Sequence, residues 1–181
     1  SRGFTRFHEV KMKIRHIVGD LLSVTSGMIV HGCNEKGKMG KGVALSIRKK
    51  YESVYYYYLM LKATEGLCIG NVQYVRVDHN LTIVNAIIQR AYGDGHTERY
   101  VDYEAVYACF LKIFNRAKID KVFTISIPKI GAGLGGGDFG KVLDKIKKAS
   151  VDTQYDGSLN IYTLETMYDR RVQANACICV C

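Results

Sequence analysis

The chain has 181 residues, 48% of them hydrophobic, with 18 glycines and a single proline. That length can bury the core of one domain, and the composition excludes a disordered or low-complexity protein. The net charge of +9 predicts a surface that attracts anions or, less specifically, one that keeps the protein dissolved. No apolar run is long enough to span a membrane and the first residues lack a signal-peptide core, so we expect a cytoplasmic protein with no membrane partner.

The hydrophobic pattern predicts strands that alternate with helices along most of the chain. Lys13–Val18 alternates polar and apolar residues, as a half-buried strand does, whereas Met28–Cys33 is short and apolar and fits a buried strand. Apolar residues at helical spacing fill Asp102–Lys118, and Asp138 stands where it can cap a further helix. The expected order is strand 13–18, strand 28–33, helix 39–51, helix 53–63, strand 71–77, strand 81–88, helix 102–118, strand 121–127, a helix after Asp138 and strand 159–164.

This order predicts a three-layer α/β/α domain with a mixed, mostly parallel central sheet. We place the domain at residues 12–165, after an N-terminal extension of residues 1–11 and before a C-terminal tail of residues 166–181. Ligands of such sheets bind beyond the carboxyl ends of the strands, so the loops that follow the strands are the place to look for a site.

Two residue types within this pattern are assigned to packing. The tyrosine run Tyr55–Tyr58 is interpreted as a packing face of its helix. Cys33, Cys68 and Cys109 lie in apolar patterns, which predicts reduced core cysteines and not a disulfide framework.

A glycine-rich stretch, IPKIGAGLGGGDFGK, begins at the end of the strand predicted at 121–127. Residues 131–136 match the dinucleotide fingerprint GxGxxG, but too few residues follow to complete a dinucleotide-binding sheet. Residues 135–141 approach a Walker A loop, but Val142 replaces the Ser or Thr that would bind magnesium. The stretch therefore predicts phosphate binding and argues against both a nicotinamide dehydrogenase and an NTPase.

A second glycine-rich segment, GKMGKG at residues 37–42, follows the strand predicted at 28–33 in the same way. Two such loops would bring two sets of backbone N–H groups and two helix N-termini to one edge of the sheet. That arrangement can hold a diphosphate from two sides, because glycine lets the backbone approach the oxygens closely. The alternative is that both segments are ordinary tight turns.

Several stretches taken together resemble the macro domain, the module that binds ADP-ribose. The likeness runs from Lys13 to Glu165 in the order and spacing of the family, and it implies the three-layer fold with a crevice formed by the two glycine-rich loops. The stretches that carry it are VGDLL at 18–22, HGCN at 31–34, GKGVA at 40–44, IPKIGAGL at 127–134 and IYTL at 161–164.

The chain is most similar to the branch that contains ADP-ribose-1''-phosphate phosphatases, terminal ADP-ribose glycohydrolases and DNA-directed antitoxin macro domains. The chain lacks the catalytic lysine and aspartate of the terminal glycohydrolases. The segment AIIQR after Asn85 has no lysine, and Gly135 stands where those relatives carry the aspartate. The HGCN run resembles the phosphatase members instead. We therefore predict a metal-independent hydrolase that acts at the distal ribose, with removal of the 1''-phosphate as the first hypothesis.

Two alternatives stay open. One is a hydrolase that releases ADP-ribose from protein or nucleic acid, and the other is a reader that binds ADP-ribose without turnover. No cofactor or metal is predicted, because the five histidines show no paired ligand spacing.

Site residues follow from the resemblance and from side-chain chemistry. His31 and Asn34 are the catalytic candidates, because imidazole can donate a proton to the leaving ribose oxygen near neutral pH and an amide can orient a ribose hydroxyl or a water. Each has a simpler interpretation, His31 as a core residue and Asn34 as the cap of the following turn. Asp20 is assigned to the adenine amine or, alternatively, to capping the turn that follows it. The predicted ADP-ribose-binding residues are Asp20, Leu21, Gly40, Gly42, Val43, Gln89, Gly131, Ala132, Gly133, Leu134, Gly135 and Phe139, with Tyr92, Asp94 and His96 as further wall candidates.

Overall fold

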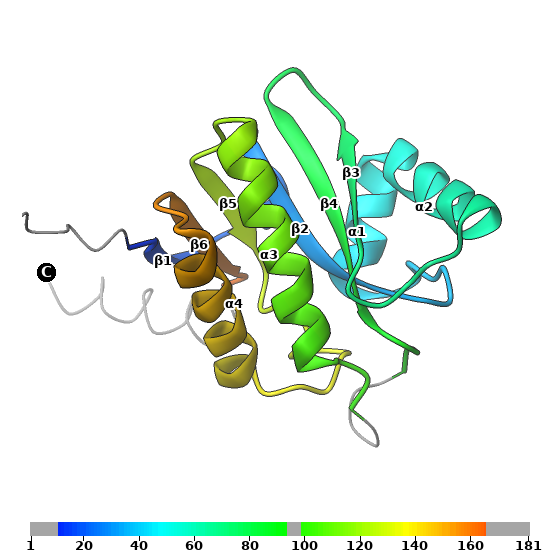
Figure 1. Ribbon diagram of the computed structural model, residues 1–181. Coiled ribbons are helices and arrows are strands. Elements are labelled where there is room, and N and C mark those ends of the chain that lie inside the picture. Colours follow the sequence, from blue (N-terminus) through cyan, green and yellow to red (C-terminus); the bar gives the residue numbers. More distant parts are fainter. Residues whose placement is uncertain (1–10, 94–98, 166–181) are drawn as a thin grey trace, which may run out of the picture.

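The computed structural model describes residues 11–93 and 99–165 of the chain. A six-stranded sheet is covered by helices on both faces, so the predicted three-layer α/β/α fold is confirmed (Figure 1). The strands are β1 (Lys13–Val18), β2 (Gly27–Asn34), β3 (Val72–Arg76), β4 (Leu81–Gln89), β5 (Thr124–Ile127) and β6 (Ser158–Thr163). The helices are the short 3₁₀ helix η1 (Leu21–Ser23) and the α-helices α1 (Gly42–Lys50), α2 (Glu52–Thr64), α3 (Tyr103–Ile119) and α4 (Phe139–Thr153).

The strand order across the sheet is β1-β6-β5-β2-β4-β3. Neighbouring strands are parallel except β3, which pairs antiparallel with β4 because only a short turn joins the two. Since β2 and β5 are adjacent and parallel, their carboxyl ends lie at the same edge of the sheet. This adjacency brings the two glycine-rich segments together.

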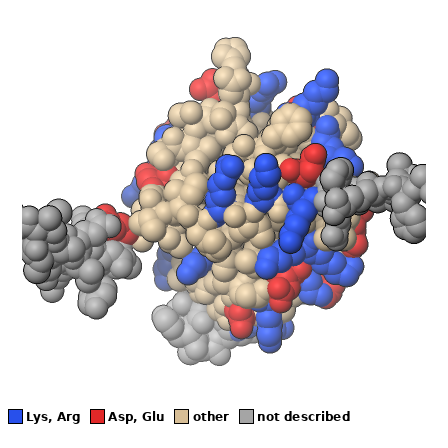
Figure 2. Space-filling model, turned by 90° about the vertical axis from the view of Figure 1, so that its left-hand side faces the viewer, with Lys and Arg blue, Asp and Glu red and all other residues tan. Residues whose placement is uncertain are grey.

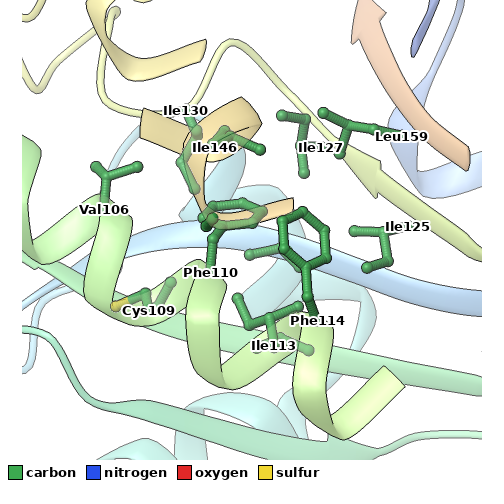
Figure 3. Close-up of a cluster of buried hydrophobic side chains, with 14 of the residues drawn as sticks. Val106, Cys109, Phe110, Ile113, Phe114, Ile125, Ile127, Ile130, Ile146 and Leu159 are labelled. Carbon is green, nitrogen blue, oxygen red and sulfur yellow. The ribbon is translucent and has the colours of Figure 1, made fainter. Parts of the chain in front are cut away.

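The face of the sheet that carries α3 and α4 is covered by a cluster of apolar side chains, the first core (Figure 3). The buried residues of α3 recur every three or four positions, because one stripe of the helix faces the sheet. Phe114 stacks on Tyr155 with ring centroids 4.7 Å apart, and both side chains are fully buried. Side chains of this kind contribute about 1.5–3 kcal/mol each on leaving water. The first core includes Val106, Cys109, Phe110, Ile113, Phe114, Ile125, Ile127, Ile130, Ile146 and Leu159.

The opposite face carries α1, α2 and the second core. Tyr58 is fully buried there, and its hydroxyl donates a hydrogen bond to the Asn34 carbonyl. Tyr56 and Tyr57 are instead 61% and 49% exposed. The packing interpretation of the tyrosine run was wrong for these two, because consecutive residues of a helix point to different sides. The second core consists of Leu21, Ile29, Cys33, Met39, Ile47, Val54, Tyr58, Leu67, Val75, Leu81, Ile83 and Ile87.

Two elements begin later than the sequence pattern suggests. The helix predicted from Met39 begins at Gly42, because Met39 is buried as a loop residue in the second core while Lys41 has an extended backbone. The strand predicted from Lys121 begins at Thr124, because Lys121 has a φ of 55° and cannot be part of a strand.

The cysteine prediction is confirmed for two residues. Cys33 and Cys109 are buried and free, and burial raises the pKa of both thiols. Cys68 is also free but exposed, so the expectation of a core position was wrong there. Its neighbour Leu67 is the residue that packs into the second core.

The edge strand β1 carries exposed basic side chains. Lys13, Arg15 and His16 are exposed on it, and Figure 2, which views the molecule from this side, shows lysine and arginine outnumbering acidic residues on this face. Charged side chains on an edge strand discourage its pairing with a strand of another molecule.

Of the helices in residues 11–93 and 99–165, each is too short or too polar to cross a membrane. The cytoplasmic location and the boundaries of the terminal extensions stay predictions.

Candidate functional site

A cavity of about 530 Å³ opens where the loops after β2 and β5 meet. A cavity of this size suits a small organic ligand. Both glycine-rich segments contribute to its walls, as the two-loop hypothesis predicts. The lining residues are His31, Gly32, Asn34, Lys38, Gly40, Lys41, Gly42, Val43, Ala44, Gln89, Tyr92, Gly93, Pro128, Lys129, Ile130, Gly131, Gly133, Leu134 and Gly135.

The first wall of the cavity is the N-terminus of α1. Lys41 is the N-cap residue, and its side chain makes no capping hydrogen bond. The first backbone bond of the helix runs from the Leu45 N–H to the Lys41 carbonyl, over 3.3 Å. The three N–H groups before it, those of Gly42–Ala44, have no acceptor within the described residues. Because the helix dipole adds partial positive charge at this end, the wall favours an anion.

The second wall is the loop after β5. The Gly137 N–H donates to the Gly131 carbonyl over 2.9 Å, and the Gly136 N–H donates to the Gly133 carbonyl over 3.0 Å. These two bonds close the loop on itself. The N–H groups of residues 133–135 are left without an acceptor in the described part of the chain. The loop therefore presents a second set of donors to the same cavity.

Glycines at the wall serve two different purposes. A Cβ added at Gly40 or Gly133 would meet no atom within 4 Å. Their bare backbone therefore leaves room for a ligand, since no protein group occupies that space. A Cβ at Gly135 would instead lie 2.4 Å from Nε2 of Gln89. Gly135 thus allows the Gln89 side chain to pack against the loop, and a larger residue would have to displace it.

Three lysines give the cavity a positive rim. Lys38, Lys41 and Lys129 line the cavity and are exposed. None of them forms an ion pair with a described Asp or Glu. No carboxylate is among the lining residues that the structure describes. Unpaired cations beside unpaired N–H groups make the cavity attractive to a ligand with more than one negative charge.

His31 lies on β2, lines the cavity and is only 1% exposed. Its Nε2 is 2.6 Å from Oδ1 of Asn85 on the adjacent strand β4. Burial lowers the pKa of His31 to about 4, an effect larger than the rise caused by the hydrogen bond to Asn85. The ring is therefore neutral at pH 7, which does not support the predicted role of proton donor to a leaving oxygen.

Asn34 ends β2 and holds the turn that follows it. Its Oδ1 accepts hydrogen bonds from the N–H groups of Lys36 and Lys38 over 3.0 and 3.2 Å. Its Nδ2 donates to the Lys38 carbonyl over 2.9 Å. The alternative role as cap of the turn is thus observed. The oxygen is fully used, so Asn34 has only one amide hydrogen left to offer a ligand.

Comparison with known proteins places this arrangement in a family. Residues 30–146 match the Macro domain family, and this range contains both glycine-rich loops, all of β5 and most of β2. The chain belongs to the macro domain family.

Solved structures share the fold of this macro domain. A protein of unknown function from Bacteroides thetaiotaomicron is 30% identical, with a TM-score of 0.72 and coverage of 83% of this chain and 98% of that one. The macrodomain of Mycobacterium tuberculosis DarG is 22% identical, with a TM-score of 0.70 over 83% of this chain and 97% of that one. Thermosipho africanus DarTG in complex with ADP-ribose is 17% identical, with a TM-score of 0.68 over 86% of this chain and 42% of that one.

A curated relative is much longer than this macro domain. Polyprotein P1234 of Eastern equine encephalitis virus (strain PE-3.0815) is 27% identical over 161 residues. The match covers 88% of this chain and 6% of the polyprotein, so the chain spans a small part of that relative's length.

Most of the predicted site residues line the cavity, and four do not. Asp20 caps η1 by accepting from the Leu22 N–H over 2.8 Å, the alternative role considered for it. Leu21 is part of the second core, Phe139 packs against the first core, and Ala132 donates its N–H to the Lys129 carbonyl. Asp94 and His96 lie outside the described residues. The predicted residues that do line the cavity are His31, Asn34, Gly40, Gly42, Val43, Gln89, Gly131, Gly133, Leu134 and Gly135, with Tyr92 from the wall candidates.

The lysine rim was not predicted from the sequence. Lys38 and Lys41 stand between the glycines of the first loop, and Lys129 lies two residues before Gly131. Their position next to glycines could have predicted the rim, because a cation beside a phosphate-binding loop strengthens the binding of an anion by the backbone N–H groups.

Proposed function

We propose that this macro domain binds ADP-ribose and holds its diphosphate between the N-terminus of α1 and the loop after β5. The observation that carries the proposal is the pair of unpartnered N–H sets, at Gly42–Ala44 and at residues 133–135, in the walls of one cavity. N–H groups fixed by the fold can bind phosphate oxygens without reorganisation. One phosphate needs one such set, whereas a diphosphate uses both.

The surroundings of these donors suit the rest of the ligand. Lys38, Lys41 and Lys129 supply positive charge for the two phosphates. Val43, Leu134 and Tyr92 line the same cavity and are 37%, 40% and 54% exposed. Exposed apolar side chains beside an anion site favour an organic phosphate over an inorganic one, because the sugar and base can cover them. The fold shared with the DarTG structure that contains ADP-ribose also supports this ligand.

Calorimetry tests the proposal. ADP-ribose should bind at one site, and AMP, which has a single phosphate, should bind at least about tenfold more weakly because it occupies one donor set.

Gly133→Val should abolish or strongly weaken ADP-ribose binding while leaving thermal stability unchanged, since the added side chain enters open space at the cavity. Gly133→Ala is the smaller matched change and should give an intermediate affinity. Unchanged affinity in Gly133→Val would contradict the proposal.

A second candidate is hydrolysis at the distal ribose, with release of phosphate from ADP-ribose-1''-phosphate as the first reaction to test. It is favoured by the position of His31 and Asn34 at the cavity, together with a lysine rim that would attract a further phosphate group. In this reaction the attacking water would bond to phosphorus and give a proton to the neutral His31 ring, which reverses the donor role predicted for it. The bond between phosphorus and the ribose oxygen would break, and the leaving oxygen would take up a proton from the ring or from solvent. Release of ADP-ribose from protein or nucleic acid, and binding without turnover, are the alternatives.

One substrate panel separates these outcomes. ADP-ribose-1''-phosphate, ADP-ribosylated protein and ADP-ribosylated DNA are each incubated with the protein, and released phosphate or ADP-ribose is measured. Phosphate release that is lost in His31→Gln, with ADP-ribose affinity kept, would support the phosphatase. Binding of ADP-ribose with no turnover on any substrate would leave the chain a reader.

A further inference from the structure

A row of hydrogen bonds crosses three strands of the sheet and ends at His31. Gln73 on β3 donates from Nε2 to the carbonyl of Tyr57 in α2 over 2.8 Å. Asn85 on β4 donates from Nδ2 to Oε1 of Gln73 over 2.9 Å. Nε2 of His31 on β2 is 2.6 Å from Oδ1 of Asn85. The three side chains are direct register partners, Gln73 with Asn85 and Asn85 with His31, so the pairing of the strands itself aligns the row.

The direction of every bond in the row follows from its first member. The Tyr57 carbonyl can only accept, so Gln73 must turn its Nε2 towards it and its Oε1 towards Asn85. Asn85 must then donate from Nδ2 to Gln73 and present Oδ1 to His31. An amide oxygen cannot donate, so the hydrogen between Asn85 and His31 belongs to the ring nitrogen Nε2. Reversal of the row would place two acceptors against each other at Tyr57.

We propose that Gln73 and Asn85 are positioning residues that hold His31 as the Nε2–H tautomer, with Nδ1 as a bare hydrogen-bond acceptor for a ligand hydroxyl or a water. The ligand part of this inference rests on the proposed function, whereas the tautomer part does not. The Cys33 sulfur lies 3.8 Å from Nδ1 and 3.7 Å from Nε2. A thiol is a weak donor. A hydroxyl from a ligand in the cavity is a stronger donor to the same nitrogen.

This assignment changes what His31 does at the site. A ring locked with its hydrogen on Nε2 has that hydrogen committed to Asn85, so it accepts at Nδ1 and does not donate to the ligand. A site that accepts a hydrogen bond from a hydroxyl disfavours a ligand without that hydroxyl, because the acceptor is then left unpaired in a buried position. Gln73, which does not touch the ring, controls this property through Asn85.

Nitrogen NMR of histidine-labelled protein tests the tautomer directly. At pH 7 the wild-type protein should show His31 with a protonated Nε2 and a non-protonated Nδ1, as a single tautomer. In Gln73→Leu, Asn85 loses the group that fixes its orientation, so the Nδ1–H tautomer should rise from under about a tenth to about half of the population. Gln73→Glu keeps an acceptor for Asn85 Nδ2 but loses the donor to the Tyr57 carbonyl. If it folds, it should retain the wild-type tautomer, because the orientation of Asn85 needs only the acceptor.

Two controls separate positioning from folding. Thr82→Val removes a polar group from β4 that makes no side-chain hydrogen bond in the described residues, and it should leave the tautomer unchanged. Thermal denaturation of Gln73→Leu and Gln73→Glu shows whether either variant unfolds. An Nδ1–H tautomer in the wild-type protein, or a tautomer that stays the same in folded Gln73→Leu, would overturn the inference.

A titration with ADP-ribose tests the acceptor role. The wild-type Nδ1 resonance should move to lower frequency as a hydroxyl or ordered water donates to it, and this shift should be reduced in Gln73→Leu. If calorimetry shows that ADP-ribose binds but Nδ1 does not move, the acceptor role is wrong. If ADP-ribose does not bind at all, the proposed function fails, and the tautomer result is judged on the unliganded protein alone.

Discussion

The two faces of the central sheet differ in what they bury. The face under α3 and α4 is covered by the first core, in which apolar side chains such as Phe110 and Phe114 meet (Figure 3). The face under α1 and α2 buries polar groups among its apolar ones, including His31 and Asn85. Both faces therefore bury an apolar core, but the face under α1 and α2 also places a buried histidine at the cavity.

Buried polar groups are costly, so the hydrogen bonds that His31 and Asn85 make on this face matter for stability. An unsatisfied buried donor or acceptor costs about 1–3 kcal/mol. His31, Asn85 and Gln73 avoid this cost by bonding to one another. Ser126 and Asn160, opposite each other in the β5–β6 register, bury an oxygen without a partner in the described residues.

The largest expected effect is a loss of packing in the first core. Phe114→Ala should destabilise the protein by about 3–5 kcal/mol, because it removes a fully buried ring and leaves a cavity. Urea denaturation measures the loss. At low temperature, the fraction that stays folded should bind ADP-ribose with wild-type affinity. A large change in that affinity would mean that the two faces are not separate.

The second face should respond to acid through His31. Its pKa is about 4 when folded and 6.5 as the ordinary value, so the unfolded chain binds the extra proton between these two values. Stability is then complete above pH 6.5 and is lost as the pH falls towards 4, by about 3 kcal/mol in total. Denaturation midpoints between pH 7 and pH 4 should fall less in His31→Gln, which cannot titrate, than in the wild-type protein. Equal slopes would show that His31 is not buried as a neutral ring.

Removal of the lysine rim should affect binding and not stability. The combined change of Lys38, Lys41 and Lys129 to Ala should weaken ADP-ribose binding about tenfold at low salt, and less at high salt, because each exposed cation contributes about 0.2–1 kcal/mol. Replacement of Lys13, Lys49 and Lys147, which are exposed and lie outside the cavity lining, is the matched control and should leave the affinity unchanged. If both triple variants lose affinity equally, overall charge and not the rim attracts the ligand.

The smallest effect is expected at the exposed part of the tyrosine run. Tyr56→Ser should change the free energy of unfolding by less than about 0.5 kcal/mol, because the ring is 61% exposed. Tyr58→Phe, which removes the hydroxyl bonded to the Asn34 carbonyl, should cost more. A larger loss in Tyr56→Ser than in Tyr58→Phe would mean that the exposed ring packs in solution.

The fold was largely readable from the sequence, because its elements have strong periodic patterns. The stripe of α3 and the capping Asp138 of α4 both appear as predicted, with the Asp138 carboxylate accepting from the Gly140 and Lys141 N–H groups. The start of α1 was not readable, because Met39 is apolar at helical spacing yet packs as a loop residue. Local pattern cannot show which contact a side chain makes once the chain is folded.

The glycine-rich loops of the candidate site could be predicted from the sequence. The contacts between side chains that are distant in the sequence could not. The two loops follow from their glycines and from their place after strands. The row from Gln73 through Asn85 to His31 joins residues far apart in the chain, and only the register of β2, β4 and β3 brings them together. The neutral state of His31 depends on the same packing. The sequence offered a core position as the simpler interpretation of this residue, but it could not show the protonation state.

Backbone amide NMR tests the central claim most directly, since that claim concerns the N–H groups themselves. When ADP-ribose is added to ¹⁵N-labelled protein, the amide protons of Gly42–Ala44 and of residues 133–135 should both shift downfield, as expected for new hydrogen bonds to phosphate oxygens. AMP should shift one set much more than the other. If ADP-ribose moves only one set, or neither, the two loops do not hold a diphosphate between them.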